Sequence, residues 1–201
     1  DDFVEGGAGM DTLLGGFGND TLNCDVDDDE ADGGGGNDSL VGADGDDTLL
    51  GQAGNDTVEG GAGSDSVEGH AGDDVLNGNG DEDTLDGGDG DDRLVGGGSS
   101  DILYGGAGND VAIGNSGNDV LIGDSGSDTL DAGDGADQLD GGLGSDLLVG
   151  GGWYDVIGLA GVAPINWLGN PKTAFWTVVL VDIWHQISFM VILLLAGLSS
   201  L

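Results

Sequence analysis

The sequence predicts an all-β fold over residues 1–158, a parallel β-roll (β-solenoid), followed by a hydrophobic segment that we expect to be helical. Three observations lead to this prediction. An aspartate stands at every ninth residue from Asp2 to Asp155, eighteen times in a row. Glycines precede nearly all of these aspartates, and an aliphatic residue usually follows two positions after each. So strict a period indicates a solenoid, in which each repeat is a structural unit stacked on the next.

The repeating unit is a nonapeptide with the consensus G-G-x-G-x-D-x-U-x, where U is a large aliphatic residue. A frame set at Gly6 gives seventeen contiguous copies ending at Gly158, such as GGAGSDSVE (60–68). We expect positions 1–6 to form a turn and positions 7–9 a short strand with position 8 facing inward. Two nonapeptides then make one coil of eighteen residues, with a thin core between two parallel sheets and successive turns on alternate edges.

The glycine-rich turns place backbone carbonyls and one carboxylate close together. Such oxygen atoms are the ligands that Ca²⁺ prefers, at six to eight per ion. The turn of repeat n lies under that of repeat n+2, so both turns can share a cation. Up to about 15 Ca²⁺ ions could then bind, one for each such pair. The predicted metal ligands are Asp11, Asp20, Asp38, Asp47, Asp56, Asp65, Asp74, Asp83, Asp92, Asp101, Asp110, Asp119, Asp128, Asp137 and Asp146.

This consensus is the signature of the RTX, or hemolysin-type, calcium-binding repeat family, and the chain resembles that family over 153 of its 201 residues. The resemblance implies a parallel β-roll with Ca²⁺ in its turns and export from Gram-negative bacteria by type I secretion, to the medium or the cell surface. Calcium-triggered folding of a secreted RTX protein is the function it implies. Two alternatives stay open: the repeat region of a surface adhesin, or the C-terminal part of a secreted protease or lipase.

The chain is strongly acidic. Forty acidic residues against two basic ones, Arg93 and Lys172, give a net charge of −38. Self-repulsion of this size opposes a compact state, whereas fifteen divalent ions would add about +30. We therefore expect folding to depend on calcium. The same charge excludes nucleic acid as a partner, because phosphates need Lys and Arg.

No catalytic constellation occurs in the sequence, so we expect no enzyme activity from this fragment. His70 and His185 are the two histidines, and neither belongs to an HExxH motif. The G-x-G strings are repeat turns, and no phosphate-cradling GxxxxGK[ST] is present. Cys24 is the single cysteine, which excludes an internal disulfide.

The repeat is imperfect at position 4, where Asp27, Asp81, Ser99 and Trp153 replace glycine. All four belong to odd-numbered repeats, and therefore to one edge of the predicted roll. The other edge should then dominate calcium binding. Repeat 3 (24–32) lacks glycine altogether, which predicts a degenerate, bulged coil.

One group of outward positions is apolar rather than polar. Exposed apolar clusters often mark contacts, which favours docking or self-association. An inside-out register of repeat 12 would also explain part of the group. The residues are Ile102, Tyr104, Val120 and Ile122 on one face, and Val111 and Ile113 beside Ala112 on the other.

The composition changes abruptly after Gly158. We expect a linker over 159–173 and a hydrophobic helix over 174–201, long enough to span a bilayer and the one segment suited to a membrane. The stretch from Asn166 onward, NWLGNPKTAFW and then VDIWH, resembles a sugar ABC-transporter permease subunit. Three interpretations stay open: a gene-fusion or assembly artefact, a membrane anchor, or an apolar cap.

Overall fold

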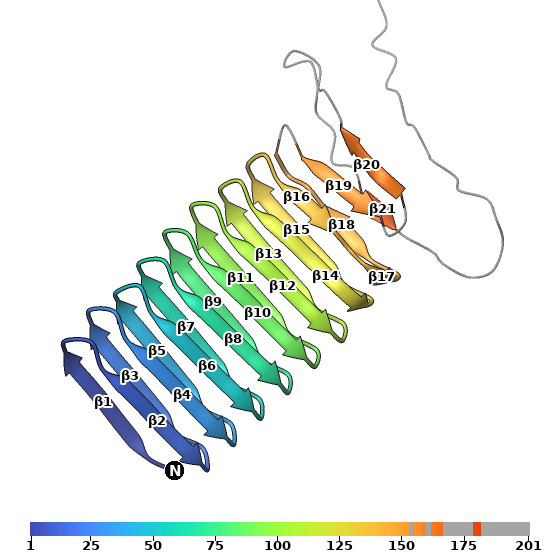
Figure 1. Ribbon diagram of the computed structural model, residues 1–201. Coiled ribbons are helices and arrows are strands. Elements are labelled where there is room, and N and C mark those ends of the chain that lie inside the picture. The colour runs from blue at the N-terminus through green and yellow to red at the C-terminus, as the bar shows by residue number, and fades with distance from the viewer. Residues whose placement is uncertain (153–154, 160–161, 167–178, 182–201) are drawn as a thin grey trace, which may run out of the picture.

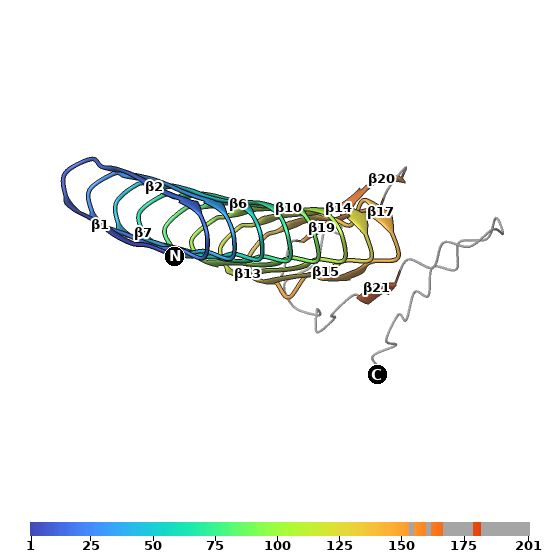
Figure 2. The ribbon, with the colours of Figure 1, turned by 90° about the horizontal axis from the view of Figure 1, so that it is seen from below.

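Two parallel β-sheets wind together into a flattened tube, as the repeat period predicts. The computed structural model describes residues 1–152, 155–159, 162–166 and 179–181. Consecutive strands from β1 to β16 alternate between the sheets, and each pairs with the strand eighteen residues later. Figure 1 shows the coils stacked along one axis, and Figure 2 shows the tube they enclose. The predicted all-β, eighteen-residue coil is confirmed.

One sheet contains the odd-numbered strands from β1 to β15, followed by β18 and β21, and is called the odd sheet. Its strands are β1 (Phe3–Ala8), β3 (Thr21–Val26), β5 (Ser39–Asp44), β7 (Thr57–Ala62), β9 (Val75–Gly80), β11 (Arg93–Gly98), β13 (Val111–Ser116), β15 (Thr129–Asp134), β18 (Leu147–Val149) and β21 (Val179–Val181).

The facing sheet contains the even-numbered strands from β2 to β16, followed by β19 and β20, and is called the even sheet. Its strands are β2 (Thr12–Phe17), β4 (Glu30–Gly35), β6 (Thr48–Ala53), β8 (Ser66–Ala71), β10 (Thr84–Asp89), β12 (Ile102–Ala107), β14 (Val120–Gly126), β16 (Gln138–Asp140), β19 (Val156–Leu159) and β20 (Val162–Asn166). A short strand, β17 (Leu143–Gly144), pairs with the end of β14.

The strands are longer than the sequence predicts. Most contain six residues, which are positions 7–9 of one repeat and positions 1–3 of the next, as in β7 (Thr57–Ala62). Only positions 4–6 remain for the turn, such as 63–65. The expected three-residue strand is therefore wrong, because the glycine positions keep pairing with the neighbouring coil even where φ is positive. Ala43, for example, pairs with Gly61.

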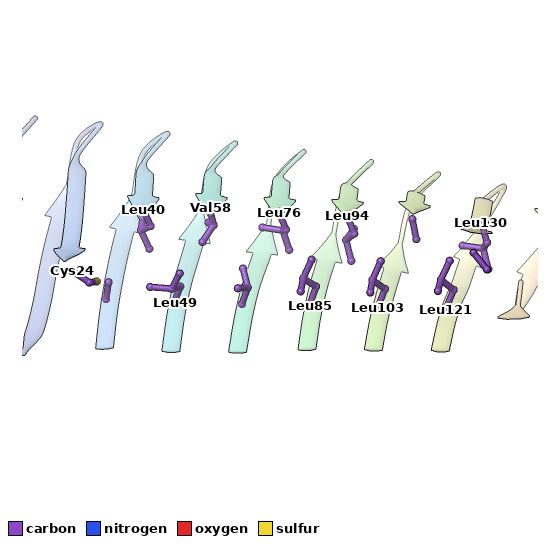
Figure 3. Close-up of a cluster of buried hydrophobic side chains, with 14 of the residues drawn as sticks. Cys24, Leu40, Leu49, Val58, Leu76, Leu85, Leu94, Leu103, Leu121 and Leu130 are labelled. Atoms are coloured by element: carbon purple, nitrogen blue, oxygen red, sulfur yellow. The ribbon is translucent and has the colours of Figure 1, made fainter. Parts of the chain in front are cut away.

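The core consists of one row of side chains from each sheet. From Leu13 to Leu148, position 8 supplies one buried aliphatic or alanine per repeat, and Cys24 and Ala132 add side chains at position 1. Figure 3 shows Leu40, Val58, Leu76 and Leu94 from one sheet facing Leu49, Leu85 and Leu103 from the other. Burial of a leucine contributes roughly 2 kcal/mol, so a core this thin offers little to oppose a large charge repulsion.

Repeat 3 is a regular coil, and the bulge expected there is absent. Its strands keep unbroken register with the next coil: Asn23 pairs with Val41, and Asp32 pairs with Leu50. Asp25 and Asp27 take the left-handed conformation, with φ values of 78° and 75°, that glycine takes at positions 2 and 4 elsewhere. Aspartate tolerates this conformation better than most residues, which explains the intact coil.

The apolar cluster of repeats 11–13 faces outward in normal register. Ile102 pairs with Val120 and Tyr104 with Ile122 across β12 and β14. On the odd sheet, Ala112 is fully buried. The inside-out register is therefore excluded.

Beyond Val149 the described residues form β19, β20 and β21. Strand β20 lies in the predicted linker and runs antiparallel to β19. Val179–Val181 lies in the predicted helix but pairs antiparallel with β18. For these three residues a strand replaces the predicted helix, and valine, at two of the three positions, favours strands. The rest of the segment 174–201 is outside the described residues.

Candidate metal centre

In the turns of repeats 1–14 and 16, the residues at positions 2 and 4 both lie in the left-handed region. In repeat 7 these are Gly61 and Gly63, with φ values of 127° and 125°. A Cβ atom on Gly63 would overlap the backbone carbonyl oxygen of Gly45 in the preceding coil. The turns therefore stack with carbonyl oxygens of one coil directly against the backbone of the next.

The sixth-position aspartates bind the coils together along both edges. The backbone N–H of Asp56 donates to Oδ1 of Asp74, one coil on, at 2.7 Å, and that of Asp74 donates to Oδ1 of Asp92 at 2.8 Å. The carbonyl of each aspartate also accepts a bond from position 7 of the next coil, as from Val75 to Asp56 at 2.9 Å. The carboxylates point inward, and Asp74 is only 1% exposed.

The second carboxylate oxygen of these aspartates is buried and makes no hydrogen bond within the described part of the chain. Burying a charged oxygen without a partner costs several kcal/mol, so such an atom indicates a missing ligand or a proton. The atoms are Oδ2 of Asp11, Asp20, Asp29, Asp38, Asp47, Asp56, Asp65, Asp74, Asp83, Asp92, Asp101, Asp110, Asp119, Asp128 and Asp137.

Position-1 glycines leave the space that these oxygens face. A Cβ on Gly42 would meet Oδ2 of Asp47 and lie 2.5 Å from the carbonyl oxygen of Gly60 in the following coil. At Gly105 the corresponding distances are 2.6 Å to Oδ2 of Asp110 and 3.0 Å to the carbonyl of Gly123. Oxygens from successive coils therefore flank one point, which fits the shared cation site that the sequence predicts.

The buried carboxylates hold protons unusually strongly. Burial, the largest cause, and neighbouring carboxylates together raise the pKa of Asp74 and of Asp83 to about 7, although one backbone hydrogen bond lowers the pKa of each. The same causes raise the pKa of Asp65 and Asp92 to about 6. A cation beside Oδ2 would relieve the unfavourable burial of charge that causes these shifts.

The donor set fits calcium. Among the described residues, no three His, Cys, Asp or Glu side chains gather into a ready metal-binding group. A cation in the turns would therefore take one carboxylate from a turn and its other ligands from backbone carbonyls. Hard oxygen donors of this kind suit Ca²⁺ rather than the transition metals.

The predicted ligands occupy equivalent places along the two edges, and two aspartates outside the predicted set, Asp29 and Asp155, accept a backbone N–H of the preceding coil in the same way. Asp29 was left out because its repeat contains no glycine. It is 5% exposed and accepts the N–H of Asp11 at Oδ1, at 2.6 Å, like the others. The unbroken nine-residue spacing of the aspartates is the sequence signal that identifies Asp29. Asp146 also accepts from the preceding coil, at 3.0 Å from the nitrogen of Asp128.

Comparison with known families agrees with this geometry. The sequence model described as RTX calcium-binding nonapeptide repeat (4 copies) matches residues 1–22, 25–58, 32–67, 50–85, 59–94, 77–112, 86–121 and 113–148. The chain belongs to the RTX calcium-binding repeat family. The coils in Figure 1 that carry the aspartate rows are therefore RTX repeats, and calcium is their expected ligand.

A second similarity concerns a much shorter stretch. The chain is 46% identical over 46 residues to the trehalose/maltose transport system permease protein MalF of Thermococcus litoralis. This match covers 23% of the RTX chain and 16% of that permease. The predicted permease resemblance of the C-terminal stretch is confirmed. In the part of the RTX chain that the structure describes, no helix is long and apolar enough to cross a membrane.

Proposed function

We propose that these RTX repeats are a calcium-triggered folding module of a secreted or surface-exposed bacterial protein. The observation that carries the proposal is the row of buried Oδ2 atoms without hydrogen-bond partners in the described chain. Bound calcium supplies the positive charge that these carboxylates lack. The family match and the net charge of −38 support the same conclusion.

The chain's own residues then have distinct roles. The sixth-position aspartates would hold the cation through Oδ2, while Oδ1 keeps the coils in register by accepting a backbone N–H of the preceding coil. Position-1 glycines leave room beside Oδ2. Up to about 15 ions could be held in this way, and no catalytic step is assigned to the repeats.

Circular dichroism tests the proposal on the full chain. In EDTA at pH 7.5 we expect a coil spectrum, and millimolar Ca²⁺ should convert it to sheet. Mg²⁺ is the control, because it demands near-octahedral geometry and retains its waters, and should be far less effective. Full sheet content in EDTA would overturn the proposal.

A further inference from the structure

A groove on the outer surface of the even sheet contains one of the chain's two histidines. It has a volume of about 300 Å³. The groove lies away from the inward-facing aspartate rows, since its side chains occupy outward positions of β8 and β10. Its lining residues are Glu68, His70, Asp86, Gly88 and Asp89.

Three side chains in this groove have the chemistry of metal ligands. Nε2 of His70 lies 3.2 Å from Oε2 of Glu68 on the same strand. Glu68 pairs with Asp86 on the adjacent strand, so the two carboxylates lie one strand spacing apart on the same face. Burial and the charge of Glu68 raise the pKa of Asp86 while His70 lowers it, which places all three groups within electrostatic range.

The placement of His70 is unusual for its position in the repeat. Gln52 and Asn79, also at position 2, reach back to an acidic residue of the preceding coil, Asp32 and Glu59 respectively. For His70 the corresponding residue is Leu50, the strand partner of Glu68. His70 therefore bonds to Glu68 on its own strand, and Asp86 of the next coil is the strand partner of Glu68.

Glycine keeps the groove open on the side of the next coil. His70 pairs with Gly88, and Gly88 pairs with Gly106, so no side chain fills the row until Asp124. The φ of His70 is 73°, close to that of Gln52 and Asn79 at the same position of the repeat, so it belongs to the turn geometry. A histidine beside two carboxylates and an open space is a reason to look for a ligand.

We propose that Glu68, His70 and Asp86 form a second kind of metal site, which binds one borderline divalent cation such as Zn²⁺ or Co²⁺ on the outside of the calcium roll. Imidazole nitrogen selects these ions over Ca²⁺, whereas the turns offer only oxygen. Glu68 and His70 side chains are each 43% exposed, so they can rotate to bring their donor atoms onto one ion. In the described chain these donors do not yet surround a common point.

Cobalt chloride is the probe for this site, added to the full chain saturated with excess Ca²⁺ so that the turns are blocked. We expect one Co²⁺ per chain, with visible d–d absorption and paramagnetic broadening of the His70 ring signals. His70→Asn should weaken Co²⁺ binding at least about tenfold. Asparagine tolerates positive φ, so this variant should keep its calcium-dependent sheet spectrum.

Two further variants complete the test. Asp86→Asn should also weaken Co²⁺ binding, while His185→Asn, which alters the other histidine, should leave it unchanged. Equal Co²⁺ binding by the wild type and His70→Asn would overturn the proposal. So would displacement of Co²⁺ by Ca²⁺ at the concentration that fills the turns, or the absence of micromolar Co²⁺ binding.

Discussion

At the scale of the residue, the sixth-position aspartate has two oxygens with different environments. In Asp74, Oδ1 accepts a backbone N–H and Oδ2 has no partner in the described chain. The first oxygen favours the folded coil under all conditions, whereas the second opposes it unless a cation or proton is present. The same side chain therefore stabilises the coil through Oδ1 and, through Oδ2, makes folding depend on a bound cation or proton.

Asp74→Asn separates these two contributions. Asparagine keeps the Oδ1 acceptor, removes one buried charge and replaces Oδ2 with an NH₂ group near the carbonyl of Gly87. We expect the metal-free chain to gain roughly 1 kcal/mol in folding free energy and the calcium stoichiometry to fall by about one. Asp131→Asn, at an exposed outward position, is the charge-matched control. If the calcium stoichiometry falls equally in both variants, Oδ2 of Asp74 is not a ligand.

At the scale of the element, the two edges of the roll differ in their regularity. The even-numbered repeats keep glycine at position 4, whereas Asp27, Asp81 and Ser99 hold left-handed φ values of 68–75° on the opposite edge. The even edge also has an unbroken ladder at position 5, in which the side chain of each residue accepts the N–H of the next, from Asn19 through Asn37 and Asn55 to Ser127.

We expect the even edge to contribute more to calcium-induced folding. The double variant Asp56→Ala, Asp74→Ala should raise the calcium midpoint in circular dichroism several-fold more than Asp29→Ala, Asp101→Ala. The reason is that Asp27 and Ser99 hold a left-handed φ at position 4 of the odd turns, at about 1 kcal/mol each, where the turns of Asp56 and Asp74 have glycine. Equal midpoints, or a larger shift for the odd-edge pair, would refute the asymmetry.

Sequence periodicity predicted the coil well because one spacing encodes both the turn and the core. It missed the six-residue strands, since glycine with positive φ is normally a turn residue, and only the neighbouring coil keeps Gly61 in the ladder. It also missed Asp29, whose repeat has lost its glycines but not its place in the aspartate row. The groove at His70 is formed by residues eighteen positions apart in adjacent coils. Inspection of one repeat at a time does not bring these residues together.

At the scale of the whole molecule, protons and calcium should act on the same carboxylates. The pKa of Asp74, Asp83 and Asp128 is about 7 in the metal-free fold, against about 3.9 for an unfolded aspartate. A raised folded pKa stabilises the fold below about pH 4, and this contribution is lost as the pH rises through 7.

Mild acid should therefore partly replace calcium. In EDTA we expect more sheet by circular dichroism at pH 5.5 than at pH 7.5, whereas the calcium midpoint should rise as the pH falls because protons compete for Oδ2. The comparison is made above the sequence pI of about 4.1, where the chain keeps its negative charge. A metal-free chain equally unstructured at both pH values would contradict this prediction.

Because consecutive strands alternate between the two sheets, the edge on which a repeat lies depends on whether an even or an odd number of repeats precedes it. Inserting or deleting eighteen residues adds or removes a complete coil and leaves every later residue on its original face. A change of nine residues instead transfers all later repeats to the opposite edge, so that Asp81 and Ser99 would interrupt the regular turns. Ligands drawn from adjacent coils, such as Glu68 and Asp86, would likewise be separated by a nine-residue change between them. The surfaces of such a protein should therefore be preserved only when its gene gains or loses an even number of repeats.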